Sequence, residues 1–199
     1  MKRMRSLPFL LLAFGLQVVV ILGMIGRYEW ICRRGEEVRL ACHAYDPFDP
    51  FRGRYLQMDV RQKFSRPATP QEGEETGFPG YYGVGNRAPY VRLEPGEVRE
   101  NGKPLHRIVE VAWHPAGEGL WMQSLQCHPW FDGQEEQWTL ELDFPHQFFL
   151  PEEYAAQAEK IFAGSPEGGV AVYKVWRGQG VLVDVEVNGV SLLSLVQSP

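Results

Sequence analysis

Two Cys-His dipeptides are the residues of this sequence that come nearest to metal chemistry. They are Cys42-His43 and Cys127-His128. Thiolate and imidazole side chains are the usual ligands of a four-coordinate zinc ion. Both dipeptides lie in segments with a strand pattern, where neighbouring side chains point to opposite faces. Each dipeptide therefore offers one ligand to a given face, and we assign no metal site and no cofactor.

The same cysteines could instead form a disulfide. The chain has three cysteines, Cys32, Cys42 and Cys127. In an oxidising compartment Cys42 and Cys127 could form a bridge, since both lie in predicted strands, which would leave Cys32 as a thiol. Spacing alone does not choose among the three possible pairings, and it is equally compatible with three reduced thiols.

Nucleophilic or acid–base catalysis would need a serine beside a desolvated lysine, or two carboxylates across a cleft. Residues 27–64 contain no serine, and Lys63 and Ser65 lie together at the edge of a predicted loop. The acid pair Glu135-Glu136 flanks a turn. Glu152-Glu153 opens a predicted helix, where acidic side chains stabilise the helix dipole. We therefore name no catalytic residue.

The strongest signal in the chain is an uncharged apolar segment at residues 7–26. Twenty helical residues rise by about 30 Å, which matches the hydrocarbon thickness of a bilayer. A cleaved signal peptide is the alternative, but residues 24–28 are too bulky for a small-x-small cleavage site. Lys2, Arg3 and Arg5 precede the segment, and basic flanks stay in the cytoplasm.

These features predict a cytoplasmic tail at residues 1–6, a transmembrane helix at 7–26 and an extracytoplasmic domain at 27–199. The net charge of the chain is −5. The first 26 residues contribute +3, so the remainder carries −8. An acidic domain argues against nucleic acid as a partner, because nucleic-acid binding needs a basic face.

Most of the domain alternates between apolar and polar residues, which is typical of strands. In the segment 53–61, for example, Leu56, Met58 and Val60 share the face that we expect to be buried. We predict strands at 37–42, 53–61, 90–94, 106–113, 120–126, 137–144, 170–176 and 181–187. Turns are predicted at 117–119, 177–180 and 188–189. The expected fold is mainly β, with antiparallel sheets in a sandwich or distorted barrel.

Two segments depart from the strand pattern. Residues 152–162 predict one short helix, which Pro151 opens and Gly164 ends. Residues 64–89 are rich in Pro, Gly and Glu and predict a long loop, which in a compact domain is either mobile or functional.

Several segments in this order resemble the GDYXXLXY family of bacterial membrane-anchored proteins. An apolar helix is followed by Asp46-Pro47-Phe48-Asp49-Pro50-Phe51-Arg52-Gly53-Arg54-Tyr55, and later by Phe149-Leu150-Pro151-Glu152-Glu153. The motif that names the family is degraded, since Arg54 replaces its acid, Met58 its Leu and Val60 its last Tyr. We expect Gly53 to allow a tight turn, Arg52 to pair with Asp46 or Asp49, and Tyr55 to cap the turn.

The resemblance implies a location in the bacterial inner membrane and a membrane-protein partner, because members occur beside or fused to multi-span membrane proteins. It implies no established biochemical activity. We therefore expect a single-pass, non-enzymatic accessory or binding subunit of a membrane complex. The alternatives are a membrane-tethered, signal-peptidase-like hydrolase and a small-ligand sensor that uses the 64–89 loop as a lid.

Overall fold

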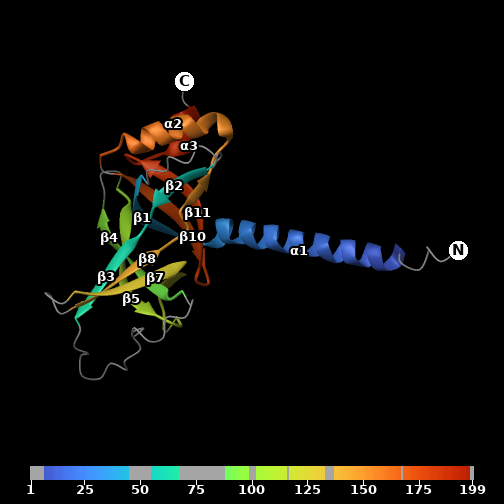
Figure 1. The fold of residues 1–199 in the computed structure, drawn as a ribbon, viewed down its shortest axis with the longest axis horizontal. Coiled ribbons are helices and arrows are strands. Elements are labelled where there is room, and N and C mark those ends of the chain that lie inside the picture. The colour runs from blue at the N-terminus through green and yellow to red at the C-terminus, as the bar shows by residue number, and fades with distance from the viewer. Residues whose placement is uncertain are drawn as a thin grey trace.

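The computed structural model of the chain describes residues 7–44, 55–67, 88–98, 102–115, 117–132, 137–166 and 168–197. One long helix projects from a β-rich domain that carries two short helices at one end (Figure 1). The helices are α1 (Leu7–Arg34), α2 (Glu152–Ala163) and α3 (Leu192–Gln197). The strands are β1 (Glu36–Ala44), β2 (Tyr55–Asp59), β3 (Gln62–Pro67), β4 (Tyr90–Val98), β5 (Pro104–Ala112), β6 (Leu120–Gln123), β7 (Gln126–Asp132), β8 (Gln137–Asp143), β9 (Gln147–Phe149), β10 (Gly169–Trp176), β11 (Gln179–Val187) and β12 (Val190–Ser191).

The predicted fold class is confirmed. The described strands form a six-stranded sheet in the order β12-β11-β10-β1-β2-β9 and two three-stranded sheets, β3-β8-β7 and β5-β4-β6. Every named pair is antiparallel, and the sheets include a curled half-barrel. Most paired strands follow one another in the chain. Strand β1 is an exception, because it pairs with β2 on one edge and with β10 on the other, and so brings the N-terminal and C-terminal parts of the domain together.

Helix α1 does not end where the apolar segment does. It continues from Gly26 to Arg34, because the eight residues after Gly26 contain no proline or glycine that would stop it. Gly35 ends it, and the backbone N–H of Gly35 donates to the carbonyl of Ile31 at 2.8 Å. A side chain at Gly35 would press on that carbonyl and on the backbone of Val175, so the close turn into β1 requires glycine.

All eight predicted strands occur, with three differences. The segment predicted as a strand at 120–126 ends at Gln123 in β6, and a separate strand that was not predicted, β7, begins at Gln126 and continues to Asp132. Strand β3 takes the first residues of the predicted 64–89 loop, because its backbone pairs with β8 from Gln62 to Pro67. Strands β9 and β12 and helix α3 were not predicted, since two to six residues are too few for a pattern.

The hairpin turns follow their residue types. Arg177 and Gly178 between β10 and β11 both have positive φ, and so do Asn188 and Gly189 between β11 and β12. Two successive left-handed residues give the turn whose twist matches that of the flanking strands. The short helix is confirmed too, with Pro151 at its N-cap, Glu152 and Glu153 in its first turn and Gly164 at its C-cap.

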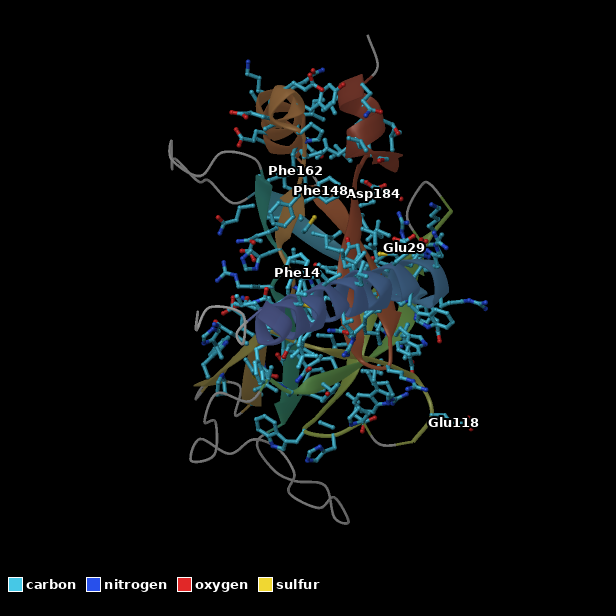
Figure 2. All side chains as sticks on the ribbon, turned by 90° about the vertical axis from the view of Figure 1, so that its right-hand side faces the viewer. Phe14, Glu29, Glu118, Phe148, Phe162 and Asp184 are labelled. Carbon is cyan, nitrogen blue, oxygen red and sulfur yellow. The ribbon has the colours of Figure 1, made fainter. Side chains whose placement is uncertain are left out.

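The main core lies between the large sheet, α2 and α3, and the smaller sheets. Leu56, Met58 and Val60 are buried, as the alternation predicts. Tyr173 is fully buried and donates from its hydroxyl to the carbonyl of Pro145 at 2.6 Å. Phe162 packs over Gly169 of β10, where a side chain would collide with its ring. Both Phe162 and Phe148 lie on the α2 side of the domain (Figure 2).

Candidate functional site

The two family-like segments of the sequence meet in the sheet. Strand β2 begins at Tyr55, and its partner β9 places Phe149 opposite Tyr55 and Phe148 opposite Leu56. Pro151 and Glu152 then lead directly into α2. The ring of Phe149 is 72% exposed, so this junction presents an aromatic side chain at the surface. Asp46, Pro47, Asp49, Arg52 and Gly53 lie outside the described residues, and the roles expected for them stay predictions.

The three cysteines, which the sequence offers as metal ligands or as a disulfide, are thiols in the structure. The structure has Cys32, Cys42 and Cys127 as thiols, with Cys42 and Cys127 buried in the core cluster. Burial raises the pKa of the Cys127 thiol to about 11, which keeps it protonated and unreactive. The proposed Cys42–Cys127 disulfide stays a prediction.

The Lys63–Ser65 pair lies on β3 and not on a loop. The hydroxyl of Ser65 is 2.9 Å from that of Thr139 on the paired strand, and Lys63 is exposed. A lysine base needs a desolvated amine, which an exposed strand position does not provide. Within the described residues, no three His, Cys, Asp or Glu side chains come together as metal ligands.

Charged side chains gather instead on one face of the large sheet. In register, Glu37 of β1 faces Lys174 of β10, Arg39 faces Val172, and Val172 faces Asp184 of β11. Two residues further along the same pair of strands, Val170 faces Glu186. The opposite face carries Val38, Leu40 and Tyr173 and belongs to the main core. The sheet thus has one apolar face and one face on which charges are buried.

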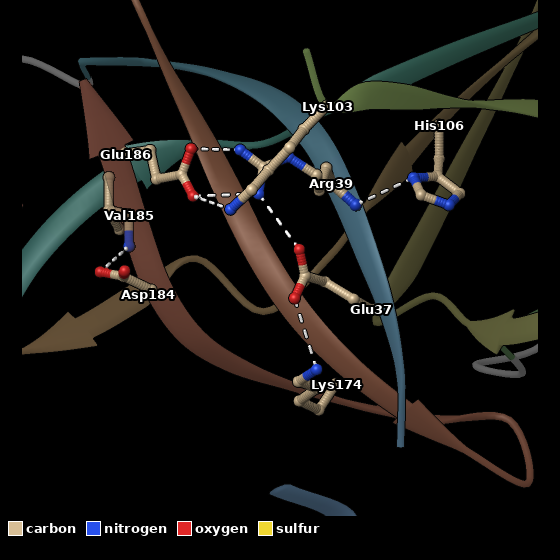
Figure 3. A network of polar contacts seen from close by, with 8 residues as sticks. All are labelled: Glu37, Arg39, Lys103, His106, Lys174, Asp184, Val185 and Glu186. Carbon is tan, nitrogen blue, oxygen red and sulfur yellow. Dashed lines mark hydrogen bonds and ion pairs between the residues drawn. The ribbon is translucent and has the colours of Figure 1, made fainter. Parts of the chain in front are cut away.

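Arg39 and Glu186 form the centre of this charged cluster (Figure 3). The exposed fraction of the side chain is 3% for Arg39 and 8% for Glu186. Both guanidinium nitrogens Nη1 and Nη2 donate to the carboxylate, with Nη1–Oε1 at 3.0 Å. Such two-point pairs are the strongest ion pairs available to arginine. Without its partner, either charge would be buried at high cost.

Further charges extend the pair towards solvent. The carboxylate of Glu37 accepts from Arg39 Nη1 at 3.2 Å and from Lys174 Nζ at 3.4 Å. Lys103 Nζ lies 3.6 Å from Glu186. Burial raises the pKa of Glu37, but the hydrogen bonds from Arg39 and Lys174 outweigh it, so the pKa lies below its ordinary value.

Two titratable groups at the edge of the cluster have pKa values shifted towards the neutral form. His106 of β5 accepts the backbone N–H of Arg39 on Nδ1 at 3.2 Å. Burial and the nearby charge of Arg39 lower the pKa of His106. Burial raises the pKa of Asp184, although Ser191 and the N–H of Val185 donate to its carboxylate. The ion pairs of the cluster join Arg39, Lys103 and Lys174 to Glu37 and Glu186, and together with the His106 hydrogen bond they link β1, β11 and β5.

The described residues also line two shallow cavities. One of about 530 Å³ lies along the β4–β5 hairpin and is lined by Pro95, Gly96, Glu97, Leu105, His106 and Arg107. One of about 210 Å³ lies between β2 and the end of β8 and is lined by residues that include Asp59, Arg61 and His146. In the second cavity Arg61 donates to Asp59 at 2.8 Å from Nε and lowers the Asp59 pKa.

The third surface lies where α1 meets the domain. From Phe9 to Ile25 the large apolar side chains of α1 are exposed, among them Phe14, which projects from the helix in Figure 2. Ile31, two turns beyond Ile25, is only 2% exposed, because the end of the helix packs on β10 and β11. Arg27 Nε donates to Gln179 Oε1 at 2.9 Å, which ties the helix to the β10–β11 hairpin.

Helix and domain together define a class: an antiparallel β domain carried on one N-terminal apolar helix that is long enough to insert into a bilayer. The chain belongs to the GDYXXLXY protein family, whose model matches residues 17–185. Comparison with curated proteins and with solved structures gives no match.

The charged cluster was not found from the sequence. Its one local signal is that Arg39 and Glu186 interrupt the interior of apolar strands, where a charge is rare unless it is paired. The partner could not be named, because the two residues are 147 positions apart in the chain.

The first prediction concerns the Arg39–Glu186 pair. Replacing one member, as in Arg39→Met or Glu186→Met, leaves a buried charge without its main partner and should cost about 3–5 kcal/mol in the free energy of unfolding. The double variant Arg39→Met/Glu186→Met should lower the free energy of unfolding by clearly less than the sum of the decreases in the two single variants. Urea unfolding of the full chain in detergent measures this, and additive losses would contradict the coupling.

The second prediction concerns pH. Because the pKa of His106 is lower in the folded chain than in the unfolded chain, the unfolded state binds more protons as the pH falls below about 6.5. Stability should therefore decrease between pH 7.5 and 5.5. In His106→Gln, whose amide oxygen can still accept the Arg39 N–H, this decrease should be smaller. Thermal melts at both pH values measure it, and the exposed His114→Gln control should behave as the wild type.

Proposed function

We propose that this chain is a single-pass protein of the bacterial inner membrane, with its β domain outside the cytoplasm, and that it serves as a non-enzymatic accessory or binding subunit of a membrane complex. The observation that carries the proposal is the way α1 is built. Its N-terminal part is exposed and apolar, and its last turns pack into the domain through Ile31.

This continuity supports an anchor over a cleaved signal. The helix is unbroken through residues 24–28, the stretch where a cleavage site would have to lie. Its C-terminal turns contribute Ile31 to the buried residues and Arg27 to a hydrogen bond with β11. Removing the segment before Tyr28 would break that bond and would leave the docked end of the helix only about two turns long.

A role in a complex is supported by the span itself. Gln17 is the one strongly polar side chain between residues 7 and 26, and it is exposed on α1. An amide in hydrocarbon gains from a hydrogen bond with a neighbouring helix. The charged cluster supports a non-enzymatic role, because its acids and cations are bound to one another and hold three strands in place.

Topology gives the third prediction. In a Cys32→Ser background, Val190→Cys places a thiol at an exposed position, the first residue of β12, since Val190 is 46% exposed. A membrane-impermeant maleimide should label this thiol in intact cells. The matched variant Ser6→Cys, on the other side of the span, should be labelled only after the membrane is permeabilised. The reverse pattern would place the domain in the cytoplasm.

The fourth prediction concerns the partner. A photo-crosslinking amino acid at position 17 should give a covalent adduct with another membrane protein in intact cells. The same amino acid at Val19, on the other side of the helix, should react mainly with lipid. Gln17→Leu should reduce the recovery of that protein with the chain in mild detergent. A chain that yields no protein adduct and migrates as a monomer would refute the accessory role.

A further inference from the structure

Four arginines and three aromatic side chains gather where α1 enters the domain. Arg27, Arg33 and Arg34 lie on the last turns of the helix and Arg177 lies at the tip of the β10–β11 hairpin. The aromatic members are Tyr28, Trp30 and Trp176. Tyr28 and Trp30 are 52% and 51% exposed, which is unusual for such large rings.

Four of these side chains form an ordered stack, which we call the cation–aromatic column. The guanidinium carbon of Arg34 lies 5.5 Å from the centre of the Trp30 ring, and that of Arg177 lies 4.5 Å from the centre of the Trp176 ring. The two indole rings meet edge to face, with centres 6.4 Å apart and planes at 69°. Helix and hairpin each contribute one cation and one indole, so the column exists only when the two elements are docked.

The hairpin cannot easily swing away from the helix. On one side Gln179 accepts the hydrogen bond from Arg27. On the other side the carbonyl of Gly178 accepts the N–H of Gln123 at 2.7 Å, and Gly178 lies against the ring of Tyr90. The column is therefore positioned before any ligand arrives, which lowers the entropic cost of binding.

The position of the column along α1 places it next to the lipid headgroup layer of the bilayer. If residues 7–26 cross the hydrocarbon, the helix leaves it at Gly26, so Arg27, Tyr28 and Trp30 stand at the depth of the lipid headgroups. Arg34 stands about 12 Å beyond the hydrocarbon, at the outer edge of the headgroups, and its side chain tilts back towards them because helical side chains lean towards the N-terminus. Tryptophan and tyrosine rings are enriched at that depth, together with arginine side chains. In Figure 1 the tip of the β10–β11 hairpin lies beside the domain end of α1.

Charge selects the kind of lipid. Two acids lie nearby: Glu29, which pairs with Arg33 at 2.8 Å, and the exposed Glu36 at the start of β1. Four arginines against these two acids leave an excess of two positive charges on a domain that is otherwise acidic. A guanidinium that lies over a ring still carries N–H donors along its edges, which can bind phosphate oxygens.

We propose that the cation–aromatic column docks the domain on the bilayer surface by binding anionic phospholipid headgroups. This rests on the membrane insertion of α1 that is part of the proposed function. Arg34 and Arg177 hold the phosphates, and Trp30 and Trp176 lie at the headgroup level between them. The domain thereby takes a fixed orientation on the membrane, with the β10–β11 hairpin towards the lipid.

The test uses the full chain in lipid nanodiscs made of phosphatidylcholine alone or of phosphatidylcholine with phosphatidylglycerol. A fluorophore is attached in Cys32→Ser/Glu36→Cys, where the buried Cys42 and Cys127 do not react, and a small share of the lipid carries a nitroxide on its headgroup. Headgroup quenching of the label should be clearly stronger in the anionic discs. A label at Val190→Cys, at the far end of β11, should show no such increase.

Arg34→Gln/Arg177→Gln should abolish the increase caused by anionic lipid, and so should high salt, which screens these charges. The control Arg107→Gln/Lys160→Gln removes two equally exposed cations elsewhere and should keep the increase. Equal quenching in both discs, or equal effects of the two double variants, would overturn the docking while leaving the anchor intact. Failure of the chain to enter discs, seen by size-exclusion chromatography, would refute the anchor and the docking together.

Discussion

Strand β10 must be covered on both faces, and the rest of the structure follows from this constraint. Five of its first six positions beyond Gly169, from Val170 to Val175, are buried, and it pairs with β1 on one edge and β11 on the other. Such a strand is stable only when both of its faces are removed from water. One face is covered by the main core beneath α2, and the other carries the charged cluster around Arg39 and Glu186.

The two faces are covered by different physical means. On the core face apolar burial supplies the free energy, as with Tyr173 and the packing of Phe162 over Gly169. On the other face Arg39 and Glu186 satisfy each other, and Val170 and Val172 are buried beside them. An ion pair in this place adds little net stability compared with apolar packing, but it links β1 to β11 across β10. The end of β10 then receives α1 through Ile31 and Gly35.

This arrangement makes helix and domain one mechanical unit. The helix is not attached through a flexible linker, because Gly35 alone separates α1 from β1 and its backbone is packed against Val175. Anything that fixes the helix in a bilayer therefore also fixes the orientation of the domain. The family-like segments around Tyr55 and Phe149 lie at the far edge of the same sheet, where the Phe149 side chain is exposed.

The sequence by itself determined the local features. The length of the uncharged segment indicated the apolar part of α1, and the alternation of residues placed Leu56, Met58 and Val60 in the core. Arg177-Gly178 and Asn188-Gly189 indicated two turns. Each of these features depends on neighbours within a few residues. The sequence missed β7, whose Pro129 argues against a strand, and β9, which is held by its pairing with β2. Only the tertiary structure decided that Arg39 meets Glu186 and that Trp30 meets Trp176. Those contacts join residues more than a hundred positions apart, and no local pattern encodes a partner at that distance.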